Sequence, residues 1–128
     1  DFAARARRNV EAFLGPDVPL DVEVRDIYEG IDATGLDRIL LDLPEPWRVV
    51  AHAEKALVPG GILLAYLPTV LQVAQLRETI AESAFGMAQT LEVLQRTWHV
   101  EGQSVRPDHR MVAHTGFLTF ARLLVPGG

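Results

Sequence analysis

A short apolar run that ends in an acid and two prolines constrains the fold of this chain more than any other feature. Residues 39–41 are Ile-Leu-Leu, Asp42 follows them, and Pro44 and Pro46 come directly after. Each proline lacks an amide donor and pushes the residue before it toward an extended conformation, so no helix or strand continues through the segment. The pattern predicts a buried parallel strand over 38–42 that stops at a rigid corner over 42–47.

The residues after the corner predict a strand, helix, strand unit and more sheet beyond it. Apolar spacing predicts a helix from Val49 that ends before Pro59-Gly60-Gly61, and a strand over 62–67 closed by Pro68. In that turn, glycine supplies left-handed backbone geometry. An amphipathic helix over 70–84 and two β-prone stretches over 90–100 and 115–124 come next, with a charged loop over 106–110 between the two stretches.

The residues before the corner predict a helix and one more strand. Apolar residues at helical spacing cover 2–13, and Val22 and Val24 alternate with charged residues up to Asp26. Alternating strands and helices that finish with a strand pair predict an α/β sheet whose parallel part is completed by antiparallel strands. Because ligands bind beyond the carboxyl ends of such strands, we expect Asp26, the corner and residues 66–69 to surround one crevice.

Composition narrows the class of protein. The chain has 128 residues, is 48% apolar and carries a net charge of -5, which predicts one soluble domain that does not grip nucleic acid by bulk electrostatics. No apolar run approaches the roughly 20 residues of a membrane span. Cysteine is absent and the four histidines lack metal-ligand spacing, so we expect a cytoplasmic protein without a metal. No nucleophile motif supports a hydrolase.

Two acids at strand ends are the candidate chemical groups, and each has a structural alternative. The proline corner can hold a flat ring, and Asp42 can accept a hydrogen bond from an exocyclic amino group and offset positive charge on that ring. Alternatively, Asp42 caps the next helix and Trp47 packs. Asp26 can accept from an adenine amino group or a ribose hydroxyl, or its side chain can start a turn before Tyr28.

With these residues in view, the chain resembles the S-adenosylmethionine-dependent tRNA methyltransferases that modify N1 of adenine 58. The matching segments are 1–3, 6–10, Asp42-Leu43-Pro44-Glu45-Pro46-Trp47, Leu57-Val58-Pro59-Gly60-Gly61, Tyr66-Leu67-Pro68-Thr69-Val70-Leu71-Gln72-Val73, Thr90-Leu91-Glu92-Val93-Leu94, Arg106-Pro107 and His114-Thr115-Gly116-Phe117-Leu118. The resemblance implies a Rossmann-like class I methyltransferase fold, S-adenosyl-L-methionine as cofactor, tRNA as partner and a homotetramer.

The resemblance also implies roles for individual residues. Asp42 is the implied catalytic carboxylate and lies near the cofactor, and Asp26 and Ile27 lie beside the adenine of the cofactor. The positions that would line the pocket or touch tRNA are Pro44, Trp47, Tyr66, Thr69, Gln72, Arg106 and His114.

The family pattern implies that residues 1–128 are the C-terminal portion of a catalytic domain whose first two strands precede Asp1. The first of these would lie between the strand that ends at Asp26 and the strand that ends at Asp42, so both would lack a ladder partner. We therefore expect the isolated chain to bind cofactor poorly. Two other functions stay open, a non-catalytic tRNA-binding subunit and a small-molecule methyltransferase of the same fold.

Overall fold

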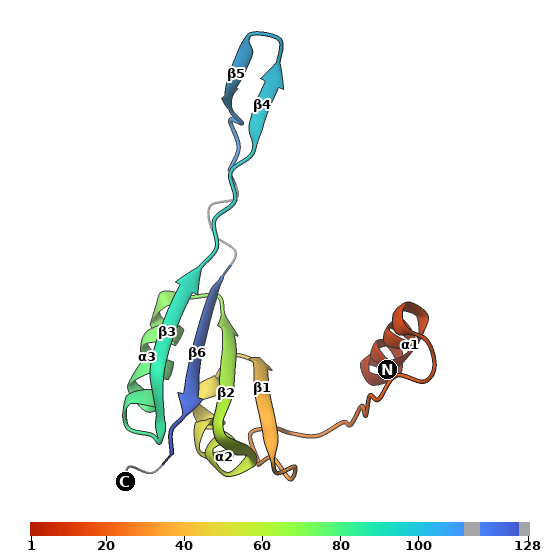
Figure 1. Ribbon diagram of the computed structural model, residues 1–128, viewed down its shortest axis with the longest axis vertical. Helices are drawn as coiled ribbons and strands as arrows, with labels where there is room; N and C mark the ends of the chain where they lie inside the picture. The colour runs from red at the N-terminus through yellow and green to blue at the C-terminus, as the bar shows by residue number, and fades with distance from the viewer. Residues whose placement is uncertain (112–115, 126–128) are drawn as a thin grey trace.

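The chain folds around one mixed sheet, one face of which is covered by helices from the middle of the chain, while the N-terminal helix lies apart from the sheet (Figure 1). A computed structural model describes residues 1–111 and 116–125. The elements, in chain order, are α1 (Phe2–Leu14), β1 (Leu36–Asp42), the 3-10 helix η1 (Pro46–Arg48), α2 (Val50–Ala56), β2 (Leu57–Leu67), α3 (Val70–Ala81), β3 (Phe85–Glu92), β4 (Trp98–Glu101), β5 (Ser104–Pro107) and β6 (Phe117–Leu123). The predicted α/β class is confirmed.

The main sheet has the strand order β1-β2-β6-β3. β1 and β2 are parallel, with Asp42 opposite Tyr66 at their carboxyl ends. β6 returns between β2 and β3 and is antiparallel to both. This arrangement confirms the prediction of a parallel part completed by antiparallel strands.

Side-chain alternation along β1 and β2 decides which residues form the core. Ile39 and Leu41 of β1 and Leu63, Ala65 and Leu67 of β2 are buried in one core, to which α2 and α3 also contribute residues. The residues between them lie on the opposite face of the sheet, where Leu40 is 68% exposed and Tyr66 is 39% exposed. Because the period of a strand is two residues, the same alternation places Asp42 on that open face.

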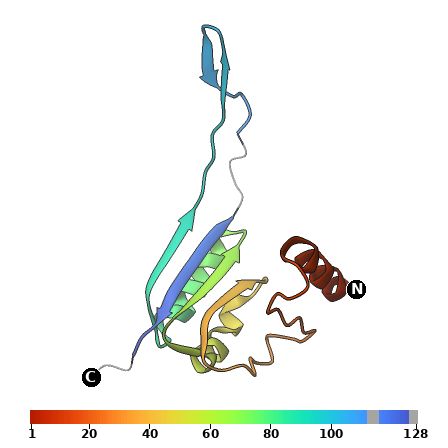
Figure 2. The same ribbon diagram turned by 45° about the vertical axis from the view of Figure 1, so that its right-hand side comes forward.

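The predicted strand over 22–25 is wrong. The chain runs from α1 to β1 without a helix or a strand and with turns at 16–17 and 27–29, and Figure 2 shows the 15–35 segment as an extended connection. No described residue pairs with 22–25 in a sheet. A strand requires a neighbour for its backbone N–H and C=O groups, so an alternating pattern without a neighbour stays irregular.

The strand boundaries after β3 differ from those predicted from the sequence. The β-prone stretch over 90–100 is divided, since β3 ends at Glu92 and β4 begins at Trp98. The charged loop predicted over 106–110 begins inside β5, which pairs with β4 in a hairpin of its own. The turn of this hairpin contains Gly102 at φ 54°. The hairpin projects away from the main sheet (Figure 1).

α3 is shorter than predicted because a serine ends it. The helix stops at Ala81 instead of residue 84. The hydroxyl of Ser83 donates to the Ile80 carbonyl at 2.7 Å and accepts from the Phe85 amide at 3.1 Å, which turns the chain into β3. Across 1–111 and 116–125 no helix is both long and apolar enough to cross a membrane.

Candidate functional site

The candidate site begins where β1 and β2 end together. Asp42 and Tyr66 are register partners on the open face of the sheet, and both are exposed. They line two adjoining hollows. One of about 250 Å³ is lined by Asp42, Leu43, Pro44, Tyr66, Pro68 and Gln72. The other, of about 220 Å³, is lined by Leu40, Leu41, Asp42, Leu64, Tyr66 and Leu118. The carboxylate therefore lies at an opening shared with the neighbouring strand end, outside the packed core.

The helix-capping alternative for Asp42 is wrong. The residue before η1 is Glu45 and the residue before α2 is Val49, and neither helix has a side-chain cap bond. The alternative for Trp47 agrees better with the structure, because Trp47 is partly buried and packs against the hydrophobic core. Pro46 beside it is fully buried, which anchors the corner. The contact of Trp47 with substrate stays a prediction.

Thr69 and Gln72 hold the corner from the side of α3. The Thr69 hydroxyl caps α3 by accepting from the Gln72 amide at 3.3 Å, and it donates to Gln72 Oε1 at 2.7 Å. Gln72 Nε2 then donates to the carbonyl of Pro44 at 3.0 Å. Gln72 lines the hollow at the corner, and the contacts of Thr69 and Gln72 with substrate stay predictions. Their side-chain polar groups are occupied in fixing the proline corner to the start of α3.

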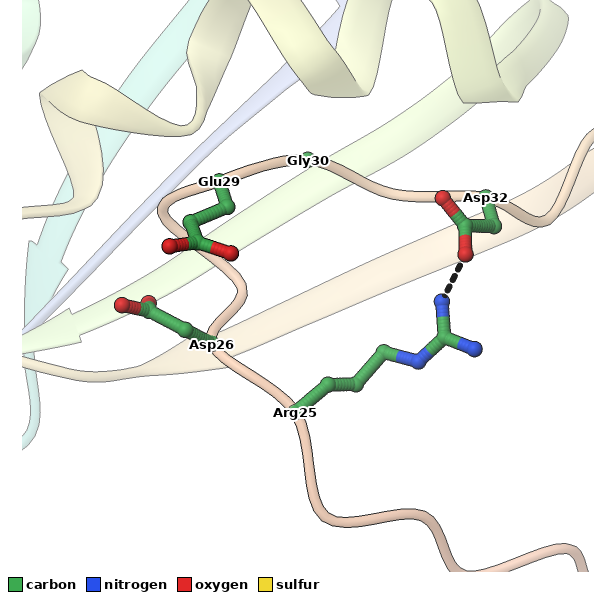
Figure 3. A pocket seen from close by; sticks show the side chains of 5 residues that line it. All are labelled: Arg25, Asp26, Glu29, Gly30 and Asp32. Atoms are coloured by element: carbon green, nitrogen blue, oxygen red, sulfur yellow. Dashed lines mark hydrogen bonds and ion pairs between the residues drawn. The ribbon is translucent and has the colours of Figure 1, made fainter.

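The loop predicted to bind cofactor forms a third hollow beside β1, shown in Figure 3. Its volume is about 270 Å³, and its lining residues are Arg25, Asp26, Glu29, Gly30 and Asp32. Asp26 Oδ1 accepts from the Tyr28 amide at 2.9 Å, which is the turn that the structural alternative predicted. The Asp26 side chain is nevertheless exposed and lines the hollow, so the turn orients its carboxylate there without burying it. Ile27 is partly buried against the core.

Arg25 is the basic residue of this hollow, and it is already paired. Its guanidinium bonds to the carboxylate of Asp32, and its Nε lies 2.7 Å from Glu23 Oε2. The hydrogen bond and the negative charge of Asp32, with that of Glu23, raise the pKa of Arg25 above its ordinary value. In Figure 3, Arg25 reaches Asp32 on one side of the loop while Asp26 and Glu29 lie together on the other. Asp26 and Glu29 supply carboxylate oxygens as acceptors.

Gly116, to which the sequence motifs assigned no role of its own, determines where the ring of Tyr66 lies. Gly116 is buried and has φ 149°, and a Cβ added there would lie 2.3 Å from Tyr66 Cε2. Only glycine lets the chain entering β6 approach the ring so closely. The sequence signal was a glycine inside the strand predicted over 115–124, which by itself does not reveal what it contacts.

Two predicted contacts with tRNA lie elsewhere or cannot be placed. Arg106 is exposed on β5 and pairs in register with His99, in the hairpin that projects from the main sheet. His114 lies outside the described residues. Among the residues that the structure describes, no group of three or more His, Asp or Glu side chains could hold a metal ion.

Comparison with known proteins identifies the family. The sequence profile of the family described as "tRNA methyltransferase complex GCD14 subunit" matches residues 3–106. The chain belongs to this family. It is 40% identical over 102 residues to a tRNA (adenine(57)-N(1)/adenine(58)-N(1))-methyltransferase TrmI of Methanocaldococcus jannaschii, an alignment that covers 79% of this chain and 36% of the relative.

Solved structures show the same fold. A SAM-dependent O-methyltransferase from Thermotoga maritima superposes with a TM-score of 0.88 at 33% identity, covering 99% of this chain and 48% of that one. The tRNA (m1A58) methyltransferase TrmI from Aquifex aeolicus superposes with a TM-score of 0.80 at 30% identity, covering 98% of this chain and 50% of that one. The predicted methyltransferase fold is confirmed, and the chain spans half or less of these relatives.

Proposed function

We propose that the protein transfers a methyl group from S-adenosyl-L-methionine to N1 of adenine 58 in tRNA, and that residues 1–128 are the C-terminal portion of its catalytic domain. The observation that carries the proposal is the exposed Asp42 carboxylate at the end of β1, beside a hollow walled by Pro44 and Tyr66. Family membership and the names of the relatives support the reaction and its substrate. Their coverage supports the assignment of the chain as one part of a longer protein.

The residues around Asp26 suit the adenosine part of this cofactor. Adenosine offers an amino group and ribose hydroxyls as hydrogen-bond donors, and the hollow beside β1 offers the exposed carboxylates of Asp26 and Glu29. Asp26 keeps its Oδ2 for such a donor while its Oδ1 is held by the Tyr28 amide. When bound, S-adenosylmethionine supplies an electrophilic methyl group on a positively charged sulfur.

Asp42 would act by position and charge. N1 of neutral adenine carries a lone pair and no proton, so its methylation requires alignment of the base and no general base. The Asp42 carboxylate would accept from the N6 amino group and offset the positive charge that appears on the ring as the N1–carbon bond forms. Pro44 and Tyr66 would bound the plane of the base. A base paired inside folded tRNA must be extruded to reach this corner.

Substitution of Asp42 tests this role, and Asp37 at the opposite end of the same strand is the matched control. In the full-length enzyme, Asp42→Asn should lower kcat for tRNA methylation by about 100-fold or more, as removal of one preorganised electrostatic group does. Affinity for S-adenosylmethionine should stay within about threefold, because the adenosine contacts proposed here involve other residues. Asp37→Asn should leave kcat unchanged. Near-normal turnover of Asp42→Asn would refute the assignment.

Two alternatives are separated by the choice of acceptor. A non-catalytic tRNA-binding subunit would bind tRNA but neither bind S-adenosylmethionine nor transfer its methyl group. A small-molecule methyltransferase, such as the O-methylating activity named for the Thermotoga maritima structure, would prefer a hydroxyl acceptor over tRNA. Methyl-transfer assays with tRNA and with small hydroxyl compounds decide among the three functions.

We also propose that the protein is a cytoplasmic homotetramer and that the β4–β5 hairpin contributes to its assembly. Large apolar side chains on and beside this hairpin are exposed, namely Val93, Leu94, Trp98, Val100 and Val105. An exposed apolar cluster of this kind favours association with another surface. Sedimentation of the full-length protein tests the state of assembly, and Val100→Ser with Val105→Ser should shift it toward smaller species. A monomeric wild type would refute the proposal.

A further inference from the structure

Tyr28 connects two parts of the candidate site that lie far apart in the sequence. Its amide donates to Asp26 Oδ1 at 2.9 Å, in the loop proposed to bind adenosine. Its hydroxyl accepts from the amide of Glu45 at 3.2 Å, in the proline corner three residues after Asp42. One residue therefore bonds to the carboxylate of the first part and to the backbone of the second.

The ring of Tyr28 is itself held in place. It is partly buried and packs against the hydrophobic core, and the guanidinium of Arg48 lies 4.2 Å from the ring centroid. Arg48 also pairs with Glu45 Oε2 at 2.9 Å. The Tyr28 carbonyl accepts from His52 Nε2 at 3.0 Å, which fixes the loop to α2. A cation over an aromatic face and a charge-assisted pair both stabilise one orientation of the ring.

We infer that Tyr28 is a positioning residue that sets the proline corner relative to the adenosine-binding loop. The inference rests on the proposed function. Methyl transfer requires the base and the cofactor to meet in line within a fraction of an ångström, and such precision depends on neighbours whose side chains are locked. Asp26 and Glu45 belong to segments of irregular backbone, where no sheet hydrogen bonds fix their spacing. Tyr28 links them, because its amide donates to Asp26 and its hydroxyl accepts from the Glu45 amide.

The test uses Tyr28→Phe in the full-length enzyme, which removes the hydroxyl and keeps the ring. Amide exchange at Glu45, followed by NMR or by mass spectrometry of the peptide that contains it, should become about 3-fold to 10-fold faster, the range for loss of one neutral hydrogen bond. The kcat for tRNA methylation should fall by a similar factor while KM for S-adenosylmethionine stays within about twofold. If Tyr28 had a merely structural role, Tyr28→Phe would lower the melting temperature without lowering kcat relative to KM for S-adenosylmethionine.

Thr79→Val is the matched control, because it removes one hydroxyl that bonds to the Gln75 carbonyl at 3.2 Å within α3. It should change neither Glu45 exchange nor kcat. Arg48→Met provides an independent variant if Tyr28→Phe does not fold. It removes the ion pair and the cation over the ring, and it should also speed Glu45 exchange and lower kcat by about twofold to fivefold.

The outcomes separate this inference from the proposed function. A wild-type enzyme that transfers no methyl group to tRNA refutes the proposed function. An active wild type whose Glu45 exchange and kcat are the same in Tyr28→Phe refutes the positioning role alone. So does a fall in kcat that Thr79→Val reproduces, or an Arg48→Met variant with unchanged exchange.

Discussion

Substitution of Gly116 tests whether the ring of Tyr66 must stand where the structure places it. A Cβ at Gly116 would lie 2.3 Å from Cε2, 2.5 Å from Cζ and 2.6 Å from the hydroxyl oxygen of Tyr66. Ordinary contact between carbon atoms begins at about 3.5 Å, so the ring must move by about 1 Å to admit a methyl group. Tyr66 is 39% exposed on the open face of the sheet, so its side chain lies outside the buried core.

Two effects of Gly116→Ala are expected, and they have different sizes. The backbone at φ 149° strains any side-chain-bearing residue, which should lower the free energy of unfolding by about 1–3 kcal/mol. The displaced ring should affect catalysis more strongly, because a misplacement of about 1 Å in an active site can cost about 100-fold in rate. We therefore expect a folded enzyme with a large loss of kcat for tRNA methylation.

Gly102→Ala is the control, since Gly102 has φ 54° and no atom within 4 Å of an added Cβ. It should lower stability by about 1–2 kcal/mol and leave kcat unchanged. Urea unfolding measures the stability of both variants, and single-turnover methyl transfer measures the rate. In a Tyr66→Ala background, adding Gly116→Ala should cause little further loss of rate, because the clashing ring is gone. Equal rates for Gly116→Ala and Gly102→Ala would refute the reasoning.

Two further substitutions test the corner and the hairpin. Gln72→Met removes the hydrogen bond to the Pro44 carbonyl and should lower kcat by about 3-fold to 10-fold. Gln75→Met, on the exposed side of α3, is the control and should leave kcat unchanged. Equal rates for the two variants would show that the bond from Gln72 to Pro44 is dispensable. Arg106→Ala should reduce the slope of log affinity for tRNA against log salt by about one without changing kcat. An unchanged slope would show that this arginine contacts no phosphate.

Local sequence patterns predicted the part of the fold that carries Asp42. The apolar runs before Asp42 and Pro68 became β1 and β2, and Pro44 and Pro46 ended the first of them as their missing donors require. Alternation along the strands then placed Asp42 and Tyr66 on the same face. The turn predicted over 58–61 lies instead inside β2, at the point where its register with β1 shifts, and Gly60 adopts the expected left-handed φ of 83° there.

Long-range contacts decided the rest. Val22 and Val24 have the alternation of a strand but form none, because a strand exists only where a neighbour completes its hydrogen bonds. The contact of Gly116 with Tyr66 and the bond from Tyr28 to Glu45 join residues separated by 50 and 17 positions. Sequence alone fixed which segments can be strands, helices or corners, since those preferences act over a few residues. The tertiary structure decided which side chains meet, because packing and pairing depend on what the folded chain brings alongside.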